Sequence, residues 1–143
     1  MEEILPGVIL DGAHNPGAIE AFAESVNTQR GNNFEKIILF SAVKEKEYET
    51  MIHMLCESVD AKQYILTQIQ NERGVSTKEL ADVFQKYTDK KIIEEENLEK
   101  AFYMALEEKG SMAGCIAWFI VSDRDAQRID SRRKKACLIL KKN

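Results

Sequence analysis

Short apolar runs alternate along this chain with segments in which apolar residues recur at helical spacing. The apolar runs predict strands at 7–10, 36–43, 63–69, 90–93 and 115–121, and the periodic segments predict helices at 16–28, 45–58, 76–87 and 96–109. This regular alternation is typical of βα units. We therefore expect an α/β fold with a mainly parallel sheet of about five to six strands and helices on both faces.

Local signals support several of these elements. The run at 36–43 is too continuously apolar for a half-exposed strand and is expected inside the sheet. Asn15 is a natural N-cap with Pro16 at the first helical position. Ser76, followed three residues later by Glu79, forms a capping-box pattern that predicts the start of the third helix.

Composition indicates one globular domain. With 143 residues, 44% of them hydrophobic and 31% charged, the chain is long enough for a real core and is ordinary for a soluble protein. Its N-terminus is acidic where a signal peptide is basic, and no apolar run is long enough to span a bilayer. We expect a cytoplasmic protein with no membrane partner.

Charge separates the end of the chain from the rest. Residues 122–143 contain eight Lys and Arg against three Asp, whereas residues 1–121 have a large excess of acidic residues. Apolar periodicity also fades after Ser122. The sequence thus predicts a domain over residues 1–121 and an atypical basic tail over 122–143.

Several kinds of site are not indicated. Cys56, Cys115 and Cys137 form no CxxC pair, so we expect neither a zinc site nor a disulfide framework, and no metal ligand is predicted. The chain has no GxxxxGK[ST] and no GxGxxG motif. An independent ATPase or dehydrogenase is therefore not expected.

Three polar clusters follow the first three predicted strands. They consist of Asp11, His14 and Asn15; of residues 41–47; and of residues 67–73. Ligands of open parallel sheets bind at the carboxyl ends of strands, where helix N-termini favour anions. Each cluster also has a structural explanation, because DG and NP are ordinary turn dipeptides and charged loops are commonly solvated. His53 lies within a helical pattern and is expected to be a packing or surface residue.

The residues around His14 resemble a known family. "VILDGAHNPGAIEAFAESV" is similar to the segment that opens the C-terminal domain of folylpolyglutamate synthases, including the bifunctional dihydrofolate synthases, in the muramyl ligase superfamily. "LFSAVKEKEYETMIHML", "YILTQIQNERGVSTKELADVF" and "NLEKAFYMAL" resemble later segments in the same order. The resemblance covers roughly residues 1–112 and implies a Rossmann-like three-layer sandwich.

The resemblance also implies a function. Enzymes of this family use ATP and Mg²⁺ to activate a folate or pteroate carboxylate as an acyl phosphate, which L-glutamate then attacks. Carried over, Asp11 is expected to bind the ATP ribose, and His14 with Asn15 to face the phosphates, with His14 as the candidate catalytic residue. Lys46, in a segment where the family reads D-K-D, is a weaker candidate for an anion contact or for a structural pair with a neighbouring acid, and Arg73 is a weaker candidate for an anion contact.

The resemblance further implies that this chain is half of a site. In the family the N-terminal domain carries the P-loop, the magnesium ligands and most folate contacts, and a G-R-x-E arginine precedes the D-G-A-H-N-P strand. Neither is present in this sequence. We expect the chain alone to bind ATP weakly and not to turn over, with the N-terminal ATPase domain of the same enzyme as its partner.

The tail departs from the family, which reads G-S-L-Y-L-x-G where this chain has "CIAWFIVSDRDAQ". Back-translated with permissible codons and read one nucleotide later, residues 116–133 can spell that motif followed by an amphipathic helix. We hypothesise a frameshift close to Cys115, in the gene or in the sequence record.

Two other functions are weighed against the ligase. One is a stand-alone Rossmann-like module that binds a nucleotide or a partner. The other is a nucleic-acid binder that uses residues 124–142, whose affinity would depend steeply on salt. The acidity of the whole chain and the lack of interleaved aromatic residues in the tail argue against nucleic acid.

Overall fold

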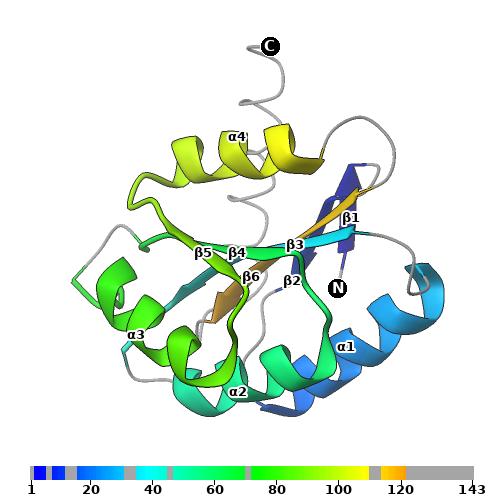
Figure 1. Ribbon diagram of the computed structural model, residues 1–143, viewed down its shortest axis with the longest axis horizontal. Coiled ribbons are helices and arrows are strands. Elements are labelled where there is room, and N and C mark those ends of the chain that lie inside the picture. The colour runs from blue at the N-terminus through cyan, green and yellow to red at the C-terminus, as the bar shows by residue number, and fades with distance from the viewer. Residues whose placement is uncertain are drawn as a thin grey trace.

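The computed structural model contains a mainly parallel sheet (Figure 1). It describes residues 2–5, 8–11, 16–30, 35–44, 47–69, 72–109 and 114–121. The strands are β1 (Glu2–Leu5), β2 (Val8–Asp11), β3 (Glu35–Ala42), β4 (Gln63–Leu66), β5 (Lys91–Glu94) and β6 (Gly114–Val121). Their order is β1-β2-β6-β3-β4-β5, and only the β1–β2 pair is antiparallel among these strands.

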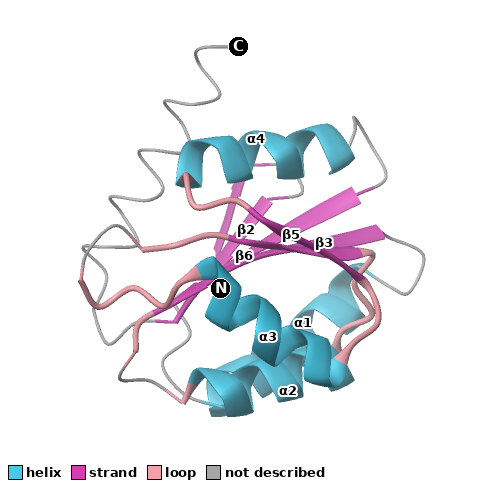
Figure 2. Ribbon diagram, turned by 60° about the vertical axis from the view of Figure 1, so that its left-hand side comes forward, coloured by secondary structure: helices cyan, strands magenta, loops and turns pink. Residues whose placement is uncertain are grey.

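Helices cover both faces of the sheet, as Figure 2 shows. The helices are α1 (Pro16–Arg30), α2 (Tyr48–Ser58), α3 (Thr77–Tyr87) and α4 (Leu98–Lys109). Helices α1, α2 and α3 lie together on one face, and α4 lies on the other. The predicted α/β sandwich of three layers, with five to six strands, is confirmed.

The alternation of side chains along β3 builds one core on each face of the sheet. Ile38 and Phe40 pack with α1, α2 and α3, whereas Ile37 and Leu39 pack with α4. Successive strand residues point to opposite faces, so a strand that is buried on both faces must be apolar throughout. This explains the continuous apolar run, and the predicted position of β3 inside the sheet is confirmed, since β3 lies between β6 and β4.

Aromatic side chains fill the larger core. The Phe40 and Phe84 rings meet edge to face with centroids 5.3 Å apart, and the Tyr64 ring lies 4.8 Å from that of Phe84. All three residues are fully or almost fully buried. Such pairs add to the stabilisation from burial alone, so this cluster ties β3 and β4 to α3.

One strand was not predicted, and another was predicted too long. The sequence gives little sign of β1, because this edge strand is short and begins with two glutamates. The predicted strand at 63–69 ends at Leu66. The Thr67 N–H donates to the Phe40 carbonyl and the Leu66 carbonyl accepts from Glu95 N–H, and these are the last bonds of β4 to its two neighbours β3 and β5.

The predicted helices differ from the observed ones at their starts. Helix α2 begins at Tyr48 rather than at residue 45, and α4 begins at Leu98 rather than at residue 96. For α4, the Asn97 side-chain oxygen accepts from Lys100 N–H at 3.0 Å and caps the first turn. On α3, Val83 and Tyr87 are only partly buried, and Ala81 is buried in addition to Leu80 and Phe84.

Polar side chains join α2 and α3 at the surface. Lys86 donates to the Glu49 carboxylate at 2.8 Å, and this contact holds the pKa of Glu49 below its usual value. His53 stacks on Tyr87 with centroids 4.2 Å apart and contacts Glu57 at 2.7 Å. The expectation that His53 is a packing or surface residue is confirmed. None of the described helices is long and apolar enough to cross a membrane.

The start of α3 offers a direct test of the predicted cap. The Ser76 hydroxyl accepts from Glu79 N–H at 3.1 Å. We expect Ser76→Ala to lower the free energy of unfolding by about 1 kcal/mol, because it leaves that N–H without its partner. Urea unfolding measures this change. Ser76→Thr keeps the hydroxyl and should retain most of the stability, so an equal loss in both variants would contradict the cap.

Candidate functional site

The carboxyl ends of the parallel strands form one edge of the sheet. Asp11, the last residue of β2, pairs in register with Phe119 of β6, which pairs in turn with Phe40 of β3. Phe40 is level with Leu66 near the end of β4. With about 4.8 Å between neighbouring strands, the Asp11 backbone lies about 10 Å from that of Phe40. The ends of β2, β3 and β4 therefore share this edge, as expected.

The loop after β4 folds back onto the end of β3. Val43 and Gly74 form an isolated antiparallel bridge. The Arg73 carbonyl accepts from Lys44 N–H at 2.8 Å, and the Ala42 carbonyl accepts from Val75 N–H at 2.9 Å. We call residues 42–44 with 73–75 the clasp. It joins the second and third polar clusters of the sequence, which are about 30 residues apart in the chain.

Gly74 is required for the clasp. A Cβ atom at this position would lie 2.3 Å from the Ile69 carbonyl oxygen and 3.3 Å from the Gln68 side chain. The first distance is far below van der Waals contact, and the obstructing atom belongs to the backbone. Only glycine permits this close approach of two backbone segments. No role for Gly74 was expected from the sequence, although a glycine in a polar loop between a strand and a helix is a usable signal.

Two hydroxyl side chains are buried just beside the clasp. The Thr67 hydroxyl donates to the Glu96 carbonyl at 3.2 Å and so attaches the end of β4 to the segment before α4. Ser41 is completely buried on β3, and among the described residues its hydroxyl oxygen has no hydrogen-bond partner. Buried polar atoms are normally paired, so Ser41 is an exception at the same edge as Asp11.

The structure describes the predicted site residues unequally. His14, Asn15 and Lys46 lie outside the described residues. Asp11 is described as the end of β2, and Arg73 is half-buried next to the exposed Lys44. The clasp thus places Arg73 beside the segment that leads to Lys46. Among the described residues, no group of three or more His, Cys, Asp or Glu side chains is arranged to hold a metal ion.

The strand order, the two helix layers and the shared carboxyl edge define an α/β domain of the Rossmann-like class. A family model described as "Mur ligase, glutamate ligase domain" matches residues 2–116. The chain therefore belongs to this family. The resemblance to folylpolyglutamate synthases, which rested on the D-G-A-H-N-P segment and the motifs after it, is confirmed by the relatives as well.

Three relatives illustrate this. A dihydrofolate synthase/folylpolyglutamate synthase of Bacillus subtilis (strain 168) is 46% identical over 50 residues, which are 35% of this chain and 11% of that protein. The structure of Mycobacterium tuberculosis folylpolyglutamate synthase complexed with ADP and AMPPCP matches with a TM-score of 0.70 at 19% identity, over 85% of this chain and 28% of that one. E. coli FolC in complex with DHPP and ADP matches with a TM-score of 0.67 at 20% identity, over 93% and 30%.

These matches have a common limit. At 19% and 20% identity the two solved structures show a shared fold and no more. The chain spans less than a third of the length of each of these relatives. The activity of a whole enzyme does not follow from the matches alone.

Proposed function

We propose that this chain is the C-terminal domain of a folylpolyglutamate synthase, a cytoplasmic enzyme that adds L-glutamate to a folate or to dihydropteroate by ATP-dependent amide ligation. The observation that carries the proposal is the match of residues 2–116 to the glutamate ligase domain family. The relative of Bacillus subtilis that is named dihydrofolate synthase/folylpolyglutamate synthase supports this substrate class. The partner is the N-terminal ATPase domain of the same enzyme, and the chain is inactive without it.

The carboxyl edge of the sheet is the proposed nucleotide-facing side of the domain. Asp11 ends β2 at this edge, and His14 with Asn15 follows it directly in the sequence. The clasp brings Lys44 and Arg73 together there. Cationic side chains and free helix N–H groups suit the phosphates of ATP, so the residues fit this cofactor.

Each group has a proposed task. Asp11 binds the ribose, His14 and Asn15 face the phosphates, and Arg73 and Lys46 add positive charge. When bound, ATP supplies the phosphoryl group that activates the folate carboxylate, and Mg²⁺ is held mainly by the N-terminal domain. The residues of this chain orient the nucleotide and stabilise negative charge as it develops.

The proposal predicts conditional nucleotide binding. The chain alone should bind ATP weakly, and the purified N-terminal P-loop domain should raise the affinity of the mixture above that of either part. Titration with a fluorescent ATP analogue measures this difference. Tight binding by the chain alone, unchanged when the second domain is added, would favour a stand-alone nucleotide-binding module instead.

Arg73 provides a variant for the same titration. Arg73→Met should weaken ATP binding to the two-domain mixture about tenfold, the usual effect of losing one charge-assisted hydrogen bond. Lys78→Met is the matched control, because it also removes one positive charge but lies in the first turn of α3 with its side chain 81% exposed. Equal affinities for the two variants would remove Arg73 from the proposed site.

The departure of the tail from the family also remains a proposal. The family match ends at residue 116, next to Cys115, where we place the frameshift. We expect the encoding DNA, read one nucleotide later after this point, to spell G-S-L-Y-L. Sequencing the DNA on both strands tests this, and codons that spell another sequence in the shifted frame would contradict it.

A further inference from the structure

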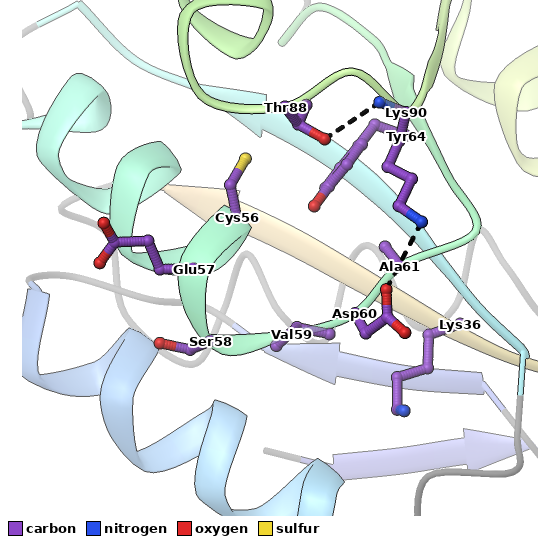
Figure 3. A pocket seen from close by; sticks show the side chains of 10 residues that line it. All are labelled: Lys36, Cys56, Glu57, Ser58, Val59, Asp60, Ala61, Tyr64, Thr88 and Lys90. Atoms are coloured by element: carbon purple, nitrogen blue, oxygen red, sulfur yellow. Dashed lines mark hydrogen bonds and ion pairs between the residues drawn. The ribbon is translucent and has the colours of Figure 1, made fainter.

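A polar cavity of about 530 Å³ opens at the edge of the sheet opposite the proposed nucleotide edge. Lys36 at the beginning of β3 and residues 59–61 before β4 form part of its lining, together with Thr88 and Lys90 before β5 (Figure 3). The end of α2 provides another wall. Amino ends of the parallel strands surround the cavity, so it is separate from the site proposed for ATP.

Lys36 is the unusual residue of this cavity. It is only 3% exposed, and alternation along β3 puts its side chain on the same face of the sheet as Ile38 and Phe40. Within the described parts of the chain, its ammonium group forms no ion pair and no hydrogen bond. A buried ammonium group without a counter-charge is unfavourable. An anion in the cavity would supply that counter-charge.

The acidic side chains of the cavity have other partners. Asp60 is paired with Lys90 at 3.6 Å, as the dashed line in Figure 3 shows. The Glu57 carboxylate contacts His53 at 2.7 Å. The Asp60 charge is thus balanced by Lys90, and the Glu57 side chain is 68% exposed to water, which leaves Lys36 as the buried charge without an ion pair among the described residues that line the cavity.

Two further lining groups are neutral. The Tyr64 hydroxyl and the Cys56 thiol both line the cavity, and burial is the main reason that the pKa values of both groups are raised. Both groups therefore stay protonated at neutral pH and add no negative charge that would repel an anion. The cavity combines one buried cation with neutral hydrogen-bonding groups.

From these contacts we infer that the cavity binds a single oxyanion group of a small molecule, a phosphate or a carboxylate, with the Lys36 ammonium as its principal contact. The nearby C-terminal ends of α2 and α3 carry partial negative charge. These partial negative charges oppose the binding of anions, and only one buried cation offsets them. The cavity therefore suits one anionic group better than the polyphosphate of a nucleotide. The site does not depend on the proposed ligase function.

Amide NMR spectra of the 143-residue chain test this inference. Inorganic phosphate and acetate are titrated separately at constant ionic strength, which distinguishes the two anion classes. We expect at least one of them to shift the amide signals of residues 57–61 and 88–90 in a saturable manner. No saturable shift there with either anion would overturn the inference, whatever the ligase assays show.

Variants locate the anion on Lys36. Lys36→Met keeps the length of the side chain and removes its charge, and it should weaken anion binding at least tenfold. Lys78→Met removes an exposed charge on α3 and should leave the affinity unchanged. If Lys36→Met binds the anion as the wild type does, Lys36 is not the contact. The spectrum of the unliganded variant shows whether it is folded.

Discussion

Replacing His14 with Ala in the two-domain enzyme is expected to lower kcat about 100-fold or more while leaving the melting temperature nearly unchanged. In the sequence His14 comes between the end of β2 at Asp11 and the start of α1 at Pro16. Loss of one group that stabilises developing negative charge commonly has an effect of this size. A residue in a connecting loop contributes little to the core, so activity should fall without unfolding.

The second histidine serves as the control. His53 is on the surface of α2, stacked on Tyr87. His53→Ala should keep turnover close to that of the wild type. If His14→Ala instead lowers the melting temperature markedly and retains turnover, DGAHNP is a structural turn.

Gly74→Ala is expected to lower the free energy of unfolding by about 1–3 kcal/mol, the usual range for forcing extra atoms into a packed site. The added Cβ would collide with the Ile69 carbonyl oxygen, so the clasp must shift. Amide hydrogen exchange should then show faster exchange of the Lys44 and Val75 N–H groups, which donate across the clasp. In the two-domain enzyme, ATP affinity should fall as well, because Arg73 moves with the clasp.

Gly17→Ala is the matched control for this variant. Gly17 is exposed near the start of α1, where alanine favours the helix and should preserve or raise stability. Unchanged stability and unchanged exchange in Gly74→Ala would contradict the tight approach of the two segments.

The sequence predicts the elements whose signals are local. Continuous apolar residues identify β3, and the spacing of Leu80 and Phe84 after the Ser76 cap identifies α3. The short β1 was not predicted because a four-residue strand that begins with two glutamates has little apolar pattern of its own. The end of β4 was predicted too late because burial continues beyond the strand, where Thr67 and Ile69 are both buried.

Part of the candidate site could also be predicted. Parallel strands must end at one edge, so the three polar clusters could be assigned to a common side from the strand pattern alone. The clasp could not be predicted from the sequence, because the pairing of Val43 with Gly74 depends on how the loop after β4 folds back onto the end of β3. The burial of Lys36 could not be predicted either, because a lysine at the start of a strand is usually solvated.

We propose above that this chain supplies the C-terminal domain that completes a folate–glutamate ligase. The most direct test mixes the purified chain with the separately expressed N-terminal domain, ATP, Mg²⁺, a folate and L-glutamate, and measures ADP release together with the mass of the folate product. We expect ADP release that requires both domains and both substrates, with a product heavier by one glutamyl residue. A mixture shown to be folded and associated that releases no ADP and forms no such product would contradict it.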